Sequence, residues 1–127
     1  RNVSVLTNLH ASTVVSPSVE IGEGTMLAPL AAINSESKVG RSCILNTGAS
    51  IDHDCKIGDY THIAPGARLA GDCTVGENCF IGMGSMVINQ ITIGNNVIIG
   101  ANSTVINDIP DNCTVVGSPA RIIKKQD

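Results

Sequence analysis

The chain has 127 residues, of which 43% are hydrophobic, and we expect a single domain with a buried core. It contains no Trp, one Tyr and one Phe, so Ile, Val, Leu and small residues must fill that core. A net charge of −3 and a pI near 5.5 argue against a nucleic-acid or acidic-membrane surface, because such surfaces need clustered Lys and Arg.

The sequence also bears on localisation. It has no run of about 18 apolar residues, and its first residues lack a basic region followed by a short apolar block. We therefore expect neither a spanning helix nor a signal peptide, and a cytoplasmic location. The basic cluster is Arg121, Lys124 and Lys125.

A strict period of six runs from Val3 to Val105. A helix would need apolar residues every 3.6 positions and a simple strand every 2, so a period of six indicates short strands joined at regular corners. The sequence therefore predicts a parallel β-helix of hexapeptide repeats, with three hexads in each 18-residue coil. Residues 1–107 would form a triangular prism of about six coils. The aliphatic positions are Val3, Leu9, Val15, Ile21, Leu27, Ile33, Val39, Leu45, Ile51, Ile57, Ile63, Leu69, Val75, Ile81, Val87, Ile93, Ile99 and Val105.

Small residues occupy a second inward position, two residues before each aliphatic one. Four of the five cysteines fall there, at Cys43, Cys55, Cys73 and Cys79. An odd number of cysteines without C-x-x-C spacing disfavours a disulfide framework or a metal site, so we interpret these four as small core residues. Cys55 and Cys73 are one coil apart and near enough for a bridge, but we expect them to be reduced.

The repeat changes at its corners and at its end. Glycine directly follows the aliphatic residue at positions 22, 40, 58, 76, 82, 94 and 100, where we expect corners with positive φ. Residues 107–112 form a turn-rich break, residues 113–116 predict one more strand, and residues 117–120 form a second break. Residues 121–126 predict a short helix or an extended tail that caps the last coil, within a single domain 1–127.

The candidate chemistry lies between Ile51 and Ile63. His53 stands between two aspartates and is either a general base or a solvated corner residue. His62 precedes an inward residue and should point outward, and His10 is expected to be structural. Asn46 lies two coils after His10, where it would be a hydrogen-bonding corner residue or would position His53.

The sequence resembles the left-handed β-helix, hexapeptide-repeat acyltransferases. It is most similar to the sugar O- or N-acetyltransferases of the sialic-acid and bacillosamine pathways. Left-handedness follows from the resemblance, since parallel crossovers are otherwise nearly always right-handed. Members of this family are homotrimers with acetyl-CoA sites in clefts between subunits. The motifs that carry the resemblance are Leu9 to Ser12 with Val15 to Pro17, Asn46 to Cys55, Thr61 to Gly66, and Val116 to Ala120.

The resemblance also implies roles for single residues. His53 would be the general base and Asp54 would raise its basicity, while His62 would contact the acetyl end of acetyl-CoA. The Gly71 N–H would face the thioester oxygen, and direct attack by the acceptor would need no Ser or Cys nucleophile. Met83, Gly100 and Ala101 would lie near the pantetheine arm. Pro119, Arg121 and Lys124 would approach the adenine and phosphates.

The expected function is transfer of an acetyl group from acetyl-CoA to an amino or hydroxyl group of a nucleotide-linked amino sugar or sialic-acid-type sugar. The resemblance also implies an amino-terminal nucleotide-sugar-binding α/β domain, but this chain opens almost directly on the first coil and has no glycine-rich phosphate loop. It is therefore a shortened form, a carboxy-terminal fragment, or a stand-alone member with another acceptor. No metal is expected.

Two other classes stay open. A trimeric β-helix can be a zinc carbonic anhydrase, which needs three histidines at a subunit interface, whereas only His53 and His62 lie close in the sequence. The scaffold can also be a structural or assembly module, which would not bind acetyl-CoA.

Overall fold

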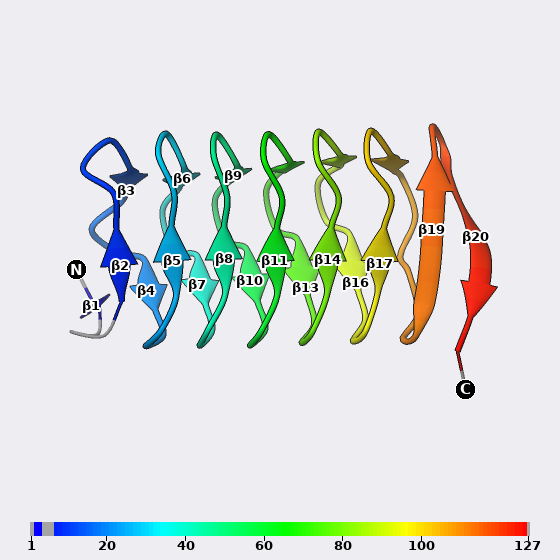
Figure 1. The fold of residues 1–127 in the computed structure, drawn as a ribbon, viewed down its shortest axis with the longest axis horizontal. Helices are drawn as coiled ribbons and strands as arrows, with labels where there is room; N and C mark the ends of the chain where they lie inside the picture. Colours follow the sequence, from blue (N-terminus) through cyan, green and yellow to red (C-terminus); the bar gives the residue numbers. More distant parts are fainter. Residues whose placement is uncertain (1, 4–6, 127) are drawn as a thin grey trace.

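The computed structural model describes the backbone of residues 2–3 and 7–126 and the side chains of residues 7–126. Pairs of residues form short parallel strands, and each strand pairs with the equivalent strand of the next coil, as His62 pairs with Phe80. The strands of Figure 1 therefore stack into three sheets that run along one axis. Strands β2 (Asn8–Leu9), β5 (Met26–Leu27) and β8 (Ile44–Leu45) point up in front while the chain advances to the right. Strands β4 (Glu20–Ile21), β7 (Lys38–Val39) and β10 (Lys56–Ile57) behind them point down, so the coil is a left-handed screw.

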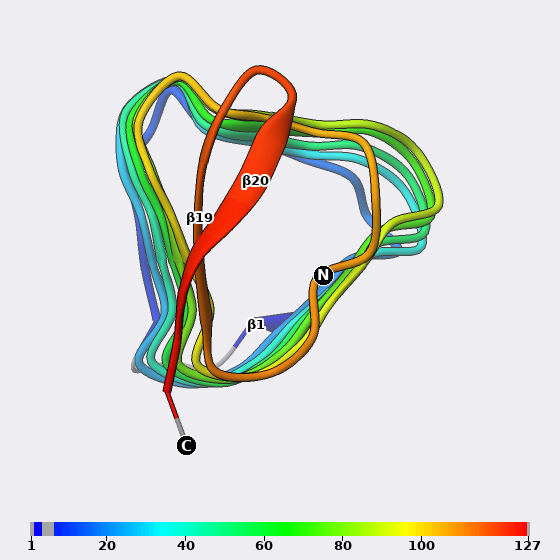
Figure 2. The same ribbon diagram turned by 90° about the vertical axis from the view of Figure 1, so that its right-hand side faces the viewer.

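The three sheets form the three sides of a prism, which Figure 2 shows end-on. Sheet A contains β1 (Asn2–Val3), β4 (Glu20–Ile21), β7 (Lys38–Val39), β10 (Lys56–Ile57), β13 (Thr74–Val75) and β16 (Thr92–Ile93). Sheet B contains β2 (Asn8–Leu9), β5 (Met26–Leu27), β8 (Ile44–Leu45), β11 (His62–Ile63), β14 (Phe80–Ile81), β17 (Ile98–Ile99), β19 (Cys113–Gly117) and β20 (Ala120–Lys125). Sheet C contains β3 (Val14–Val15), β6 (Ala32–Ile33), β9 (Ser50–Ile51), β12 (Arg68–Leu69), β15 (Met86–Val87) and β18 (Thr104–Val105).

The predicted β-helix and its interior are confirmed. Every hexad aliphatic from Val15 to Val105 is buried, Leu9 is half-buried, and the side chain of Val3 lies outside the described residues. The small inner positions from Val19 to Ser103 are buried as well. Since a narrow prism has room for one large and one small side chain per short side, the repeat of six specifies the core directly.

The cysteines share the interior with Ser and Thr, and all five are buried and unbridged. At the inner position a hydroxyl donates to a carbonyl 15 residues later, as Thr61 Oγ1 does to the Gly76 oxygen at 2.8 Å. The Cys55 thiol makes the same contact, to the Ala70 oxygen at 3.3 Å. The prediction that these cysteines are small core residues is therefore confirmed, and their thiols also satisfy corner carbonyls.

The expected role of the corner glycines was wrong. None of the glycines at 22, 40, 58, 76, 82, 94 and 100 has a positive φ, which occurs instead two residues later, for example at Gly24, Ser42 and Tyr60. These glycines are needed because successive coils touch there. A Cβ on Gly58 would lie 2.6 Å from the carbonyl carbon of Gly76 in the next coil. The αL corners are instead occupied largely by Asn, Asp and Gly, which tolerate that conformation best.

The carboxy-terminal end closes the stack. β19 joins sheet B beside β17, where Ile98 pairs with Thr114, so this last step is 114 − 98 = 16 residues instead of 18. Ile109 keeps the contact with sheet A through a parallel bridge to Ile93. β20 then turns back antiparallel to β19 and crosses the end of the prism in Figure 2. The predicted strand at residues 113–116 is confirmed, and of the two alternatives for the last residues the extended one is correct.

Candidate functional site

His53 lies at the corner between sheets C and A, after β9 and before β10. The next residue, Asp54, adopts φ of 57°, and its Oδ2 lies 3.0 Å from His53 Nδ1. Because a carboxylate oxygen only accepts, Nδ1 carries the proton and Nε2 is the free basic atom of the neutral ring. This hydrogen bond is the main reason that the pKa of His53 is raised.

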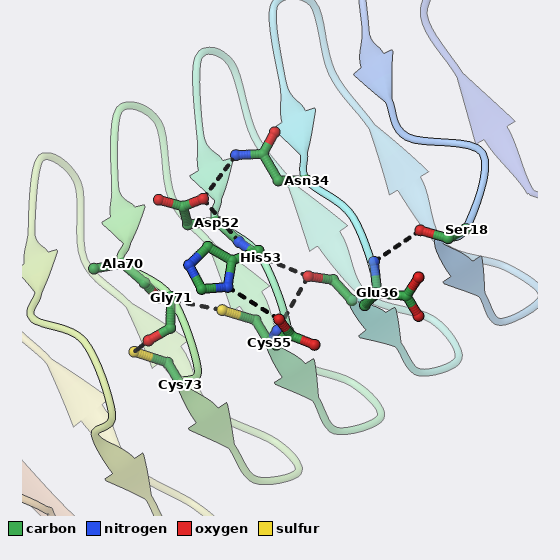
Figure 3. Close-up of polar contacts among 11 residues, drawn as sticks. Ser18, Asn34, Glu36, Asp52, His53, Cys55, Ala70, Gly71 and Cys73 are labelled. Atoms are coloured by element: carbon green, nitrogen blue, oxygen red, sulfur yellow. Dashed lines mark hydrogen bonds and ion pairs between the residues drawn. The ribbon is translucent and has the colours of Figure 1, made fainter.

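A second carboxylate fixes the backbone at this corner. Asp52 Oδ1 accepts from the His53 backbone N–H at 2.8 Å and from Asn34 Nδ2 at 2.9 Å, and these two bonds lower the pKa of Asp52. Figure 3 shows Asn34, Asp52 and His53 in this arrangement. Asn34 was not among the residues predicted from the sequence, although its position one coil before Asp52 places it directly beneath that residue in the column.

Gly71 lies beside the His53 ring in the next coil (Figure 3). A Cβ at this position would lie 2.5 Å from Nε2 and 2.6 Å from Cε1 of His53, so the ring occupies the space that a side chain would take. Gly71 is buried, and its N–H has no hydrogen-bond partner among the described residues. The equivalent N–H groups of Arg41 and Glu77 donate to side-chain oxygens at 2.8 Å. An unpaired buried N–H is rare and marks a candidate donor to a ligand.

His62 lies elsewhere, on the outer surface of β11 in sheet B. Its Nε2 is 3.2 Å from Asn46 Nδ2, and its ring meets Phe80 edge-on with centroids 5.1 Å apart. Partial burial lowers the pKa of His62. Of the two roles expected for Asn46, the structure therefore gives it a hydrogen bond, but to His62 and not to His53. Phe80, which was also not predicted from the sequence, lies one coil after His62 and pairs with it.

The remaining cofactor candidates follow the corner between sheets B and C. Met83 and Ala101 are exposed there, and their N–H groups have no partner within residues 7–126. The Gly100 N–H donates to the Val115 oxygen at 2.9 Å, and a Cβ on Gly100 would lie 2.8 Å from Val116 Cγ1, so this residue offers neither a free donor nor open space. Arg121 lines a shallow hollow at the carboxy-terminal end together with Ile106.

The candidates thus divide into two groups on opposite sides of the prism. His53, Asp54 and Gly71 lie at the corner between sheets C and A, which is opposite sheet B in the triangle of Figure 2. The other group lies on sheet B or at its corner with sheet C: Asn46, His62, Met83, Gly100 and Ala101. One chain alone does not bring both groups to one ligand.

The third histidine has a local partner. His10 Nδ1 accepts from the Ser12 N–H at 3.1 Å and lies 2.9 Å from Ser12 Oγ.

In residues 7–126 no three His, Cys, Asp or Glu side chains gather as ligands for one metal ion. The described part of the chain has no helix that is long and apolar enough to cross a membrane.

Comparison with known proteins places the fold in a family. The model for bacterial transferase hexapeptide (six repeats) matches residues 36–71 and 72–107. The chain belongs to this hexapeptide transferase family. No curated protein matches this hexapeptide transferase.

Solved structures resemble the hexapeptide transferase closely. PerB from Caulobacter crescentus, crystallised with CoA and GDP-perosamine, shares 45% identity with a TM-score of 0.93, over 95% of this chain and 58% of that chain. The acetyltransferase domain of PglB from Neisseria gonorrhoeae FA1090 shares 39% identity with a TM-score of 0.90, over 92% of this chain and 57% of that chain. WeeI from Acinetobacter baumannii AYE shares 36% identity with a TM-score of 0.86, over 89% of this chain and 56% of that chain. The hexapeptide transferase therefore spans less than two thirds of each.

Proposed function

We propose that this hexapeptide transferase moves an acetyl group from acetyl-CoA to the amino group of a nucleotide-linked amino sugar, with His53 as general base. The observation that carries the proposal is the His53 ring held against Gly71, with Asp54 on Nδ1 and Nε2 free. The similar PglB domain was crystallised with acetyl-CoA, and PerB with CoA and GDP-perosamine. Those two proteins thus bind the ligand classes that this chemistry requires.

The proposed reaction is a direct attack. The acceptor nitrogen forms a bond to the thioester carbonyl carbon while His53 Nε2 removes its proton, and the carbon–sulfur bond then breaks. The proton on His53 is passed to the leaving CoA thiolate. A positioned general base contributes roughly 10²- to 10⁴-fold to such a step. The unpaired Gly71 N–H is the candidate donor to the oxyanion, and losing such a donor costs roughly 10²- to 10³-fold.

An amine fits this corner better than a hydroxyl. Asp54, Asp52 and Asp72 all place negative charge near His53, and each contributes to its raised pKa. Carboxylates attract the ammonium form of an amino sugar, which a hydroxyl acceptor does not have, and this ammonium loses one proton to solvent before the neutral amine attacks. A shallow hollow on sheet C next to His53, lined by Asn34, Asp52 and Arg68, would hold polar groups of the sugar. We therefore favour N-acetylation.

The division of the candidates into two groups supports a homotrimer with sites between subunits. The corner of one subunit that carries His53 would meet sheet B of the next, which carries His62. Apolar side chains follow the outer surface of sheet B at Met26, Ile44, Phe80 and Ile98, whereas sheet A presents Glu20, Lys38 and Lys56 instead. The hexad aliphatics cannot be the reason for assembly, because one prism already buries them. Sedimentation should give the mass of three chains, and a monomer at micromolar concentration would refute this arrangement.

The other candidates would bind the cofactor along this interface. The free N–H groups of Met83 and Ala101 would hold amide oxygens of the pantetheine arm, and Gly100 would lie near it, although Val116 already fills the space of a Gly100 Cβ. Pro119, Arg121 and Lys124 at the carboxy-terminal end would approach the adenine and phosphates. The five unbridged thiols are compatible with a reducing compartment, and we propose the cytoplasm.

Calorimetry and a CoA-release assay test the proposal. The parent should bind acetyl-CoA and release CoA when a GDP-linked amino sugar, or a small amino sugar at high concentration, is added. His53→Ala should lower turnover by roughly 10²-fold or more and leave acetyl-CoA affinity nearly unchanged. His10→Ala is the matched control, because His10 bonds only locally to Ser12. Absence of acetyl-CoA binding would favour a structural module, and unchanged turnover in His53→Ala would remove the base assignment.

A further inference from the structure

The carboxylate of Asp52 uses one of its oxygens within the protein and leaves the other free. Asp52 Oδ1 accepts from Asn34 Nδ2 at 2.9 Å and from the His53 backbone N–H at 2.8 Å. Asp52 Oδ2 has no hydrogen-bond partner in the part of the chain that the structure describes. The two bonds to Oδ1 stabilise the ionised carboxylate and lower the pKa of Asp52. Asp52 therefore presents a charged acceptor in a fixed orientation.

The free oxygen lies on the reactive side of the His53 ring. In Figure 3 it points away from Asn34, and it lies with His53 Nε2 on the side of Ala70. Asp52 and Ala70 both line the shallow hollow on sheet C. Asp54 differs from Asp52, because its Oδ2 is bonded to Nδ1 on the other edge of the ring. An acceptor sugar in the hollow would thus meet Asp52 Oδ2 and His53 Nε2 together.

We infer that Asp52 makes this hexapeptide transferase select amines over hydroxyls, and that Asn34 is the residue that positions the Asp52 carboxylate. The inference rests on the proposed function and names the atom that makes the selection. A neutral amine has two N–H groups and one lone pair. One N–H donates to His53 Nε2, the other donates to Asp52 Oδ2, and the lone pair attacks the thioester carbon. All groups on the nitrogen are then used.

A hydroxyl does not satisfy the same two acceptors. Its single O–H must donate to His53 Nε2, and one of its two lone pairs attacks the thioester carbon. The second lone pair then faces Asp52 Oδ2, so two acceptors meet without a proton between them. A site built around a hydrogen bond rejects an analogue that lacks the donor, because the polar group of the protein is left unpaired.

The Asp52→Asn substitution changes only the free atom. The contacts from Asn34 and from the His53 backbone both come from donors, so the oxygen of the new amide must stay in the place of Oδ1. Its NH₂ group then replaces Oδ2, and an acceptor becomes a donor. For an amino sugar that the parent acetylates, we expect kcat/KM to fall roughly 10- to 100-fold, as for a lost hydrogen bond to a charged group. Affinity for the same sugar with a hydroxyl in place of the amine, measured by calorimetry with CoA present, should not fall.

Asp72→Asn is the matched control for charge. Asp72 lies one coil after Asp54 and also raises the pKa of His53, but its carboxylate makes no hydrogen bond among the described residues. A purely electrostatic role of the carboxylates would give similar losses in Asp52→Asn and Asp72→Asn. We expect instead that Asp72→Asn keeps the preference for the amine. Asn34→Ala should reduce this preference less than Asp52→Asn does, because Asp52 keeps its charge and loses only its orientation.

Thermal melts of the variants establish that each one is folded, and if Asp52→Asn is not, the comparison of Asn34→Ala with Asp72→Asn decides. An unchanged preference in folded Asp52→Asn, or equal losses in Asp52→Asn and Asp72→Asn, would overturn the assignment of Asp52. An unchanged preference in Asn34→Ala would remove the positioning role of Asn34. A parent that acetylates no amino sugar would instead count against the proposed function.

Discussion

Gly71→Ala is the sharpest test of the geometry around His53. Gly71 does not have a left-handed φ, so alanine fits the backbone, and the three atoms nearest to its new methyl group would all belong to the His53 ring. That methyl would lie 2.5 Å from Nε2, whereas ordinary contact begins at 3.4 Å, and the ring must therefore move by about 0.9 Å. A displacement of about 1 Å at a catalytic group costs roughly 10²-fold in rate.

Stability should hardly change. The His53 side chain is 54% exposed, so the ring can move into solvent without opening a cavity. We expect the free energy of unfolding to stay within about 0.5 kcal/mol of the parent value. The backbone N–H of residue 71 is retained, so the loss of activity would report the displaced ring and not a lost donor.

Steady-state CoA release and a thermal melt measure the two effects separately. Gly58→Ala is the control for a glycine whose Cβ meets backbone, and it should lower the melting temperature instead. In a His53→Ala background the Gly71 substitution should have no further effect on turnover, because the ring it displaces is gone. Parent-like turnover in Gly71→Ala, or an equal loss on both backgrounds, would refute the argument.

Three further outcomes are expected. Asp54→Asn removes the main cause of the raised pKa of His53, so the acid limb of the kcat/KM profile should move to lower pH, and turnover should fall less than in His53→Ala. An acid limb that stays in place would show that another group titrates there. Thr61→Val deletes the hydroxyl that donates to the Gly76 oxygen at 2.8 Å and accepts from the Cys79 N–H at 3.2 Å. Urea titration should show a loss of about 2 kcal/mol, and a neutral result would contradict the importance of these inner hydrogen bonds. Cys55→Ser should be well tolerated by the same measure, because a hydroxyl replaces the thiol donor to the Ala70 oxygen.

The sequence by itself determined the fold and the interior. Equivalent positions of successive coils have the same surroundings, so the period of six predicts which side chains point inward without any knowledge of distant contacts. The assignment of Cys55 and Cys73 to the core followed from that register alone. The same register predicts which residues stack in neighbouring coils, because residues one coil apart lie above one another. It therefore could have predicted Asn34 beneath Asp52 and Phe80 above His62.

Only the tertiary structure decided what lies across a corner and which side of the prism a residue occupies. Asn46 and His62 make a diagonal contact between neighbouring coils, which the register does not specify. Gly71 was expected as a hydrogen-bond donor, but its closeness to the His53 ring depends on a side-chain conformation. The repeat also gives every corner the same pattern, although the three sides of the prism differ in surface. The separation of His53 from His62 thus depends on the closure of the coils into a triangle. The number of residues between them in the sequence does not say on which side of the prism each one lies.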